Sequence, residues 1–507
     1  MSVQSYNPTT GESVDTAIAE SSRGDVAAAC AAAAGAARDL ATRSRDWRAP
    51  GLAAIAAALE ADATEIIALA DAETGLGVAR LGGELKRTCF QFRFFATVVR
   101  DGGFLEASID HATDSPMGPL PDLRRQLVPL GVVGVFGASN FPLAFSVPGG
   151  DTASALAAGC PVVIKAHPAH PRTSKATFDA ISRASTQVGA PEGSVNLVFG
   201  LEAGVALVED PRVSAVGFTG SYAAGRALFD RAQSRPVPIP FYGELGSVNP
   251  LVVTPAAAAA RAQAIGEGVV GSVTLGSGQF CTKPGLVFVP AGDAGDALVA
   301  AAVAALVAGA GATMLTGPIR DRFESGVEFL DQVRGVECLG RSGRSSSDAG
   351  SYAALFSCDV ATLEGEHEAL ARECFGAVAV FVRYGSSAEV LEAISSLEAA
   401  LTFSVHAVDD DPDGPALLAA GVAKAGRVLV NGFPTGVGVS WSMHHGGPHP
   451  AATSSLHTSV GATGIRRWLR PVCYQNLPAP WLPEALRDDN PLGIPQRVDG
   501  VLRVADR

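Results

Sequence analysis

The sequence predicts an α/β protein built on two doubly wound parallel sheets, and three features of the chain indicate this fold class. Short apolar runs of strand length alternate with helical, Ala-rich segments through most of the 507 residues. Within each run successive residues are apolar, which is typical of parallel strands that helices cover on both faces. Glycines follow several helical segments, where they allow the chain to turn back towards the sheet.

Helices come first along the chain. They are predicted over residues 25–43, 52–71 and 81–101. Residues 104–126 contain three prolines and are predicted to form a loop or an extended arm. Five strands alternating with helices are expected next, over residues 132–136, 161–165, 195–199, 215–218 and 238–242. Right-handed crossovers should join these strands in one parallel sheet.

A second unit of the same kind is expected to begin near Asn249. Its predicted helices and strands cover residues 255–270, 286–289, 296–308, 377–382 and 427–430. Two sheet domains therefore account for most of the chain. The segment 104–126 and the residues after 438 lie outside them.

Charge and composition argue against several classes of function. The chain carries 38 basic and 51 acidic side chains, a formal net charge of −13, and no basic block, so nucleic-acid binding is disfavoured. The N-terminal residues lack the pattern of a signal peptide, and no apolar run reaches the ~20 residues that span a bilayer. The eight cysteines include no CxxC pair, so neither a metal site nor a disulfide framework is indicated. We expect a cytoplasmic protein that does not bind membranes.

Cys281 is the candidate nucleophile. It follows Ser277-Gly278-Gln279, whose small residues let a substrate approach the backbone. The alternative is a buried, inert cysteine, which is the usual state of a free cysteine. Glu244 follows the last predicted strand of the first sheet, at the edge where doubly wound proteins bind ligands. It is the candidate base that activates water, with a helix cap or a solvated loop charge as the alternative.

Two further motifs follow strands of the first sheet. Asn140 follows the first strand, and its amide can join the backbone N–H of Cys281 in stabilising an oxyanion. Ordinary turn chemistry is the alternative for this residue. Later, a strand turns into a helix at Gly220 and Ser221, with Gly225 one turn further on. A helix N-terminus of this kind attracts phosphate, although such turns are common and the motif alone is weak support.

These motifs resemble those of the aldehyde dehydrogenase superfamily, and the resemblance covers nearly the whole chain. It implies that Glu244, in Glu-Leu-Gly-Ser, is the general base and that Cys281, in Gly-Gln-Phe-Cys, is the nucleophile. Asn140, in Asn-Phe-Pro, would belong to the oxyanion hole. The implied reaction oxidises an aldehyde to an acid through a thiohemiacetal and a thioester on Cys281. The presence of Glu244 favours hydrolysis of the thioester over transfer to coenzyme A.

The resemblance also implies how the chain divides. Residues 1–103 and 127–245 would form a Rossmann-like nucleotide-binding domain, and residues 246–438 a catalytic domain. Residues 104–126 and 439–507 would form an oligomerisation arm and a C-terminal tail. The resemblance implies, in addition, that the protein forms a homodimer or a homotetramer.

The family binds NAD or NADP, and the resemblance places the cofactor residues. Lys165, at the end of the second strand, would contact the nucleotide ribose. The turn at Gly220 and Ser221, with Gly225, would hold the pyrophosphate. Glu373, in Glu-Cys-Phe-Gly with Phe375, would bind the nicotinamide ribose.

A departure at the second strand bears on cofactor choice. NAD-preferring relatives usually have a glutamate three residues after the lysine, where this chain has Pro168. Without that carboxylate a 2′-phosphate meets no like-charge repulsion, and Lys165, His167 and Arg172 are candidate donors to it. We therefore expect NADP to be preferred, with NAD as an alternative. His167 filling a turn or capping a helix is the competing interpretation.

The C-terminal third resembles one branch of the family. Its segments 431–436, 442–451 and 470–475 look like those of α-ketoglutaric semialdehyde (2,5-dioxopentanoate) dehydrogenases. That branch implies oxidation of 2,5-dioxopentanoate to 2-oxoglutarate. Fatty-aldehyde dehydrogenases share some of these traits, so oxidation of medium- or long-chain aldehydes is the alternative.

A substrate of this kind carries a carboxylate and needs a cation in the tunnel. Arg87 and Gln91, at i and i+4 on the third predicted helix, are candidates to line it, together with Phe141. Arg87 could bind the substrate carboxylate bidentately. The alternative for Arg87 is a surface salt bridge with Glu84.

A Cys-dependent esterase or acyltransferase is the competing class of enzyme. Cys281, Glu244 and Asn140 alone would suit acyl transfer without a nucleotide. The retained cofactor residues Lys165 and Glu373 argue against that class.

Overall fold

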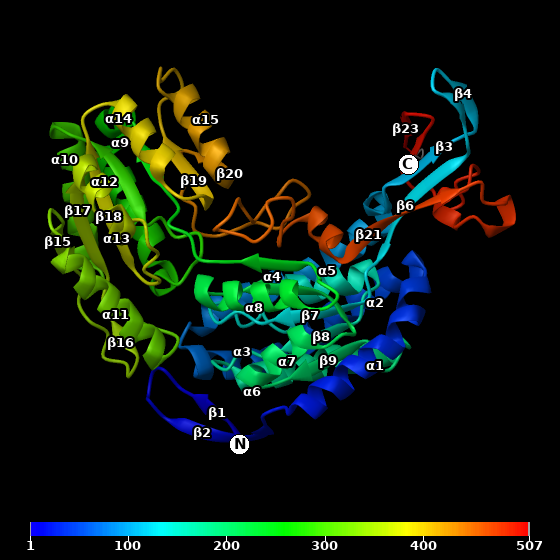
Figure 1. Ribbon diagram of the computed structural model, residues 1–507. Helices are drawn as coiled ribbons and strands as arrows, with labels where there is room; N and C mark the ends of the chain where they lie inside the picture. Colours follow the sequence, from blue (N-terminus) through cyan, green and yellow to red (C-terminus); the bar gives the residue numbers. More distant parts are fainter. Residues whose placement is uncertain (1, 505–507) are drawn as a thin grey trace.

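The computed structural model describes residues 2–504 and contains two large sheets, each with helices on both faces (Figure 1). The first sheet has five strands in the order β11-β10-β7-β8-β9, and every pairing is parallel. Their bounds are Val132–Phe136 (β7), Val162–Lys165 (β8), Val195–Val198 (β9), Val213–Thr219 (β10) and Phe241–Glu244 (β11). The five predicted strands are confirmed, with small shifts at their ends.

Alternate side chains of this sheet face two different layers of helices. Val133 and Val135 pack with helices α2, α4, α5 and α6, whereas Val132 and Val163 pack with α1, α7 and α8. Because both faces are covered, all five residues of β7 are buried. The helices are Arg23–Thr42 (α1), Arg45–Ala61 (α2), Ala63–Thr74 (α3), Val78–Asp101 (α4), Gly150–Ala158 (α5), Pro171–Gln187 (α6), Leu201–Glu209 (α7) and Tyr222–Ser234 (α8).

The helix predicted over residues 52–71 is in fact two helices, α2 and α3. They meet at Asp62, whose backbone (φ −96°, ψ 13°) departs from helical geometry. The apolar periodicity continues across the break because both helices pack against the same core.

The second sheet has seven strands in the order β15-β17-β18-β13-β12-β19-β20. The pairing of β15 with β17 is antiparallel and the other five are parallel. The strands are Leu251–Val253 (β12), Leu286–Pro290 (β13), Glu337–Arg341 (β15), Ala354–Asp359 (β17), Val378–Tyr384 (β18), Ala400–His406 (β19) and Ala425–Val430 (β20). Three of them, β13, β18 and β20, were predicted. The other four, β12, β15, β17 and β19, stand between long helical or irregular stretches and were missed.

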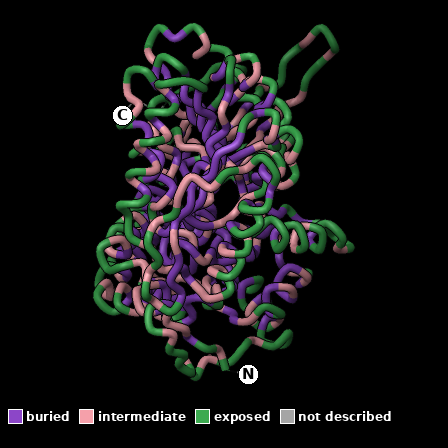
Figure 2. The backbone as a smooth tube through the Cα atoms, turned by 90° about the vertical axis from the view of Figure 1, so that its left-hand side faces the viewer, coloured by how far each residue is buried: buried purple, intermediate pink, exposed green. Residues whose placement is uncertain are grey.

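Helices also cover both faces of the second sheet. Helices α9 and α10 pack on one face, and α11, α12, α14 and α15 contribute to the core on the other. Their bounds are Pro255–Thr274 (α9), Asp293–Ala308 (α10), Gly317–Gln332 (α11), Val360–Gly365 (α12), His367–Leu370 (α13), Ser387–Ser396 (α14) and Gly414–Lys424 (α15). In Figure 2 the buried backbone runs through the middle of the molecule and the exposed loops surround it.

Of the two predictions for residues 104–126, an irregular loop or an extended arm, the structure agrees with the extended arm. These residues contribute Ala107–Asp110 (β3) and the first part of Leu123–Pro129 (β6) to a third sheet, which extends away from the two domains (Figure 1). Its order is β21-β6-β3-β22-β23, with Leu469–Gln475 (β21), Gln496–Val498 (β22) and Val501–Arg503 (β23). A hairpin of Thr113–Ser115 (β4) and Gly118–Leu120 (β5) accommodates the prolines that suggested a loop. The partner strand β21 lies far along the chain, so local sequence gave no sign of the pairing.

A hairpin at the start of the described chain links the domains. Ser2–Tyr6 (β1) and Ser13–Ala19 (β2) form a hairpin whose turn contacts the second domain, because Ala349 N donates to Pro8 O at 2.8 Å. Ala312–Thr313 (β14) pairs with Gly350–Ser351 (β16) close by. Residues 440–460, drawn in orange, pass between the domains with little regular structure (Figure 1).

Candidate active site

The loop that carries Cys281 is bent by three consecutive residues in the left-handed region. Gly276, Ser277 and Gly278 have φ values of 56°, 62° and 67°. A Cβ on Gly278 would lie 2.3 Å from the carbonyl carbon of Gly376, so glycine is required there. The hydroxyl of Ser277 donates a 2.8 Å hydrogen bond to a backbone carbonyl, which fixes the strained turn. The turn leaves Cys281 half-buried at the seam between the domains.

Cys281 contacts a histidine that sequence analysis did not select. Its Sγ is 3.5 Å from Nε2 of His445. The other ring nitrogen of His445, Nδ1, is 2.6 Å from Oε2 of Glu244. Both partners are buried, with 4% and 6% of their surface exposed. Thiol, imidazole and carboxylate therefore follow one another, as in sites where a base activates a nucleophile and a third group orients the base.

Electrostatics favours charged forms for His445 and Glu244. Burial lowers the pKa of His445, but the Glu244 carboxylate and the Cys281 sulfur outweigh burial and raise that pKa above its usual range. Burial raises the pKa of Glu244, and the contact with His445 reverses this, so its pKa is lowered. At neutral pH the pair is an imidazolium and a carboxylate. An imidazolium beside a thiol stabilises the thiolate.

The carboxylate of Glu244 keeps room for another partner. Its contact with His445 has the distance of an ion pair, but neither carboxylate oxygen finds a partner with hydrogen-bond geometry in the part of the chain that the structure describes. A buried carboxylate without such a partner is costly unless a ligand or a water completes it. Glu244 can therefore accept a proton or a hydrogen bond from a water molecule in the site.

His445 is held in place by its own segment. Its backbone N–H donates to Oγ1 of Thr458 at 2.7 Å, and the Thr458 hydroxyl donates back to its carbonyl at 3.1 Å. Nearby, Ala451 O accepts from the backbone of the residue after Glu244 at 2.8 Å. His445 stands 164 residues after Cys281, so no local spacing connects the two. The only signal was a pair of adjacent histidines before Gly-Gly-Pro.

Asn140 lies against the nucleophile loop, as expected for an oxyanion donor. Its Nδ2 donates to the carbonyl of Gln279 at 2.8 Å, two residues before Cys281. An amide has two N–H bonds, so one remains for an oxyanion. Arg80 holds Asn140 from the other side by donating to its backbone carbonyl at 2.8 Å. The structure thus brings together the three predicted catalytic residues, Cys281, Glu244 and Asn140.

Ser247, where relatives have a second glycine, takes part in a brace behind the nucleophile. Its hydroxyl donates to Oδ1 of Asn249 at 2.9 Å and accepts from the backbone N–H of Leu401 at 2.9 Å. Nδ2 of Asn249 donates to the carbonyl of Cys281 at 2.6 Å and to that of Lys283 at 3.0 Å. The substitution therefore adds a contact instead of disrupting the loop.

The end of the first sheet offers groups that fit a dinucleotide. Lys165 is buried at the end of β8, burial lowers its pKa to about 8, and no acceptor within residues 2–504 pairs with its ammonium. Gly220 and Ser221 are exposed at the start of α8, where Ser221 also caps the helix by accepting from Ala224 N. Gly225 packs so closely that a Cβ would lie 2.2 Å from a neighbouring leucine carbon. An unpaired buried cation and an open helix N-terminus suit a nucleotide with its pyrophosphate.

Glu373 stands on the other side of the seam. Burial raises its pKa to about 7, and Lys283 and a hydrogen bond from the Ser247 backbone counteract burial only in part. A Cβ on Gly246 would meet Oε2 of Glu373 at 2.0 Å, so this carboxylate lies directly against the segment that carries Glu244. Phe375, the other residue predicted in this motif, is half-buried.

His167 does not supply the charge expected of it. Burial, His170 and Lys165 lower the pKa of His167 well below its usual range, so the ring is neutral at pH 7. Its Nδ1 accepts from the backbone N–H of Ala169 at 3.1 Å, which leaves Nε2 as the N–H donor. The turn-filling interpretation therefore describes His167 better than a cationic phosphate ligand. The side chain of Arg172 is exposed at the start of α6.

The residues predicted to bind substrate differ in their placement. Phe141 packs edge-on against Phe280, beside Cys281, with ring centroids 5.1 Å apart. The guanidinium of Arg87 lies over an aromatic ring and donates to a backbone carbonyl at 3.3 Å; no ion pair joins it to Glu84 in residues 2–504. Gln91 is 1% exposed and donates to the carbonyl of Ala144 at 3.3 Å. Gln91 therefore braces a loop, and its predicted contact with substrate finds no support.

Comparison with known proteins decides the family. The model of the aldehyde dehydrogenase family matches residues 1–471. The chain belongs to the aldehyde dehydrogenase family. It is similar to α-ketoglutaric semialdehyde dehydrogenase 2 of Azospirillum brasilense, at 48% identity over 98% of this chain and 96% of that protein. It is also similar to α-ketoglutaric semialdehyde dehydrogenase of Acinetobacter baylyi, at 42% identity over 90% of this chain and 88% of that one.

Solved structures agree on the fold. Aldehyde dehydrogenase 21 from Physcomitrella patens, in complex with the reaction product succinate, superposes with a TM-score of 0.80 at 19% identity, covering 94% of this chain and 95% of that one. The 1-pyrroline-5-carboxylate dehydrogenase of Thermus thermophilus gives a TM-score of 0.80 at 20% identity, covering 94% and 90%. These comparisons confirm the predicted fold. As an aldehyde dehydrogenase, the protein is an enzyme that oxidises aldehydes with NAD or NADP.

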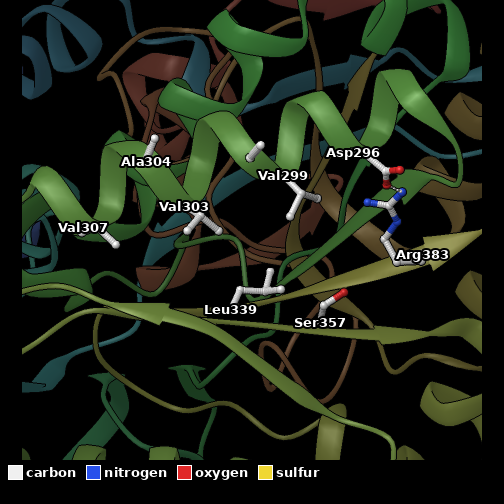
Figure 3. A pocket seen from close by; sticks show the side chains of 9 residues that line it. Asp296, Val299, Val303, Ala304, Val307, Leu339, Ser357 and Arg383 are labelled. Carbon is white, nitrogen blue, oxygen red and sulfur yellow. Dashed lines mark hydrogen bonds and ion pairs between the residues drawn. The ribbon is translucent and has the colours of Figure 1, made fainter.

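Other features of this aldehyde dehydrogenase lie away from the site. No helix within residues 2–504 is long and apolar enough to cross a membrane, and no cluster of His, Cys, Asp and Glu side chains in that range could hold a metal ion. A surface groove of roughly 780 Å³ lies between α10 and the strands β15, β17 and β18 (Figure 3). Asp296 and Arg383 form an ion pair at one end, and apolar side chains, most of them valine and alanine, line most of the rest, together with Ser357.

Proposed function

We propose that the protein oxidises 2,5-dioxopentanoate (α-ketoglutaric semialdehyde) to 2-oxoglutarate, with NADP as the preferred cofactor and NAD as an alternative. The observation that carries this proposal is the similarity at 48% and 42% identity, over most of the chain, to two proteins named as α-ketoglutaric semialdehyde dehydrogenases. The half-buried Arg87, which forms no direct ion pair with Glu84 within residues 2–504, supports an acidic substrate.

The first half of the reaction uses the relay at Cys281. The His445 imidazolium stabilises the thiolate of Cys281, which attacks the aldehyde carbon. The free N–H of the Asn140 amide and the backbone N–H of Cys281 stabilise the resulting oxyanion. Bound NADP would supply the hydride acceptor for this carbon, and loss of the hydride would leave a thioester on Cys281.

The second half hydrolyses the thioester. The Cys281 sulfur contributes to the raised pKa of His445, and this contribution disappears once the thiolate has become a neutral thioester. The imidazolium then loses its proton to solvent more readily. The Glu244–His445 pair takes a proton from water, hydroxide attacks the thioester carbon, and the carboxylic acid leaves as the thiolate returns.

The cofactor proposal places NADP at the carboxyl edge of the first sheet. Lys165 would hold the adenosine ribose and its 2′-phosphate, Gly220 and Ser221 the pyrophosphate, and Glu373 the nicotinamide ribose. Pro168 is exposed beside Lys165 and offers no carboxylate to repel a 2′-phosphate. Because His167 is neutral, it can contribute only an N–H donor.

The third sheet is proposed to be the oligomerisation arm of a homodimer or homotetramer. Its outer strand β23 ends the sheet, and Val501 and Leu502 on it are 64% and 57% exposed. An exposed apolar edge strand favours pairing with another chain. Light scattering coupled to size-exclusion chromatography would measure the mass in solution, and a monomer would contradict this assignment.

Substrate and cofactor are tested together by following absorbance at 340 nm. Purified protein is assayed with 2,5-dioxopentanoate, succinic semialdehyde and decanal, each with NAD and with NADP, beside Cys281→Ala. We expect the highest kcat/KM with the dioxo acid and NADP. A preference for decanal would refute the substrate, and ester hydrolysis that ignores NADP without any aldehyde oxidation would refute the reaction.

A further inference from the structure

Two arginines, one from each domain, hold the same loop beside the active site. Arg87 on α4 donates from Nη2 to the carbonyl of Val437 at 3.3 Å. Arg427 on β20 donates from Nη1 to the carbonyl of Gly436 at 2.9 Å, and from Nη2 to that of Pro434. The loop of residues 434–437 is therefore fastened at three of its four carbonyls.

Each guanidinium nevertheless keeps one buried nitrogen that finds no acceptor within residues 2–504. The unpaired nitrogens are Nη1 of Arg87 and Nε of Arg427. Leaving a buried, charged donor unsatisfied costs more than a typical hydrogen bond contributes, so such groups usually await a ligand or a water. Here the two unsatisfied N–H groups belong to arginines that hold the same loop. This arrangement indicates a site for an anionic or strongly polar ligand.

Both arginines lie within electrostatic reach of the nucleophile. Burial lowers the pKa of Arg87, and Glu84 and the Cys281 sulfur act in the opposite direction. Burial also lowers the pKa of Arg427, and Cys281 again opposes it. In addition, the guanidinium of Arg87 lies 5.0 Å from the ring centroid of Phe145, which packs 6.2 Å from the ring of His445.

We propose that Arg427 is a second specificity residue, which acts with Arg87 to recognise a 2-oxo acid. The Nη1–H of Arg87 would donate to the substrate carboxylate, and the Nε–H of Arg427 to the adjacent 2-oxo oxygen. These two acceptors share one planar edge of the substrate, so two donors approaching from opposite domains can satisfy both. This inference rests on the proposed function, since it needs a substrate with an oxo group next to its carboxylate.

The test compares three aldehydes of equal chain length: 2,5-dioxopentanoate, 5-oxopentanoate, which lacks the 2-oxo group, and pentanal, which lacks the carboxylate as well. In Arg427→Met we expect kcat/KM for the dioxo acid to fall about 10- to 100-fold, as for loss of a hydrogen bond to a charged group. The value for pentanal should change less than about three-fold. In Arg87→Met we expect kcat/KM to fall for both acids and to stay nearly unchanged for pentanal.

Two further variants separate recognition from support of the loop. Thr435→Val removes the two hydrogen bonds between Thr435 and Ser272, the hydroxyl–hydroxyl contact at 2.6 Å and the donation to the Ser272 carbonyl at 3.0 Å. It therefore loosens the loop while leaving both arginines intact. We expect it to affect the three aldehydes alike. Arg427→Lys keeps a cation without the Nε–H, and should lose selectivity for the dioxo acid over 5-oxopentanoate even if Arg427→Met does not fold.

The outcomes distinguish the two proposals. Equal losses on all three aldehydes in both Arg427 variants, or the same selectivity change in Thr435→Val, would overturn the role of Arg427 and leave the proposed function standing. Wild-type enzyme that prefers pentanal to both acids would overturn the proposed function, and this inference with it.

Discussion

Replacing His445 by asparagine tests the central contact of the site. Two unit charges 3.5 Å apart attract by about 4–5 kcal/mol at an effective dielectric constant of ~20. Desolvation of the pair offsets part of this attraction. If about half of this attraction survives, the substitution removes roughly 2–3 kcal/mol of stabilisation from the thiolate of Cys281. We therefore expect kcat/KM to fall about 10²-fold, which is at the lower end of the usual contribution of a general base.

The assay combines aldehyde oxidation with alkylation of Cys281 by iodoacetamide, which reports the nucleophile without cofactor. At pH 7 the alkylation rate of His445→Asn should fall by about ten-fold or more. The neighbouring His444→Asn is the control, because the side-chain contact with the sulfur comes from Nε2 of His445, the next residue. Equal alkylation rates in wild type and His445→Asn would refute the proposed relay.

Three further changes probe the rest of the site. Asn140→Ala should lower kcat by about 10²–10³-fold with little change in cofactor affinity, measured by steady-state kinetics and by titration with NADP. Pro168→Glu places a carboxylate on an exposed turn near Lys165 and should shift the NADP/NAD ratio of kcat/KM towards NAD by about ten-fold or more; an unchanged ratio would contradict the proposed position of the 2′-phosphate. Because the pKa of Glu373 is raised to about 7, the fraction of ionised carboxylate, which accepts hydrogen bonds, increases between pH 6 and 8. The affinity for NADP, measured by calorimetry, should therefore rise over that range. The rise should vanish in Glu373→Gln. Above pH 8 the affinity should fall again as Lys165, with its pKa of about 8, loses its proton.

The first sheet could be predicted because its information is local. All five residues of β7 are apolar and buried, and the helices beside it end at glycines such as Gly159. The resemblance to the family implied an arm from residues 104–126 and the C-terminal tail, but the strand pairing of the third sheet could not be predicted, because β6 pairs with β21 across more than three hundred residues. A strand whose partner is distant carries no signal beyond its own composition, and the prolines of the β4–β5 hairpin suggested a loop.

The residues of the active site likewise fall into those that the sequence could predict and those that it could not. Cys281, Glu244 and Asn140 stand in short motifs at strand ends and tight turns, where the chemistry constrains neighbouring residues. His445 comes from an irregular segment, and only folding places its ring between the sulfur and the carboxylate. The loss of charge at His167 arises from burial, which sequence does not reveal. The brace formed by Asn249 depends likewise on contacts that exist only in the folded chain.

The placement of Cys281 at a seam has a mechanical consequence. The sulfur belongs to the second domain, whereas Glu244 and Asn140 belong to the first, and the hydrogen bond from Asn140 to Gln279 spans the gap. A small rotation of one domain against the other would separate nucleophile, base and oxyanion donor at once. The catalytic groups are therefore aligned only while the two domains are docked against each other in the orientation described. On heating, activity should disappear before the circular dichroism of the helices changes, because misalignment of the domains precedes the melting of either one.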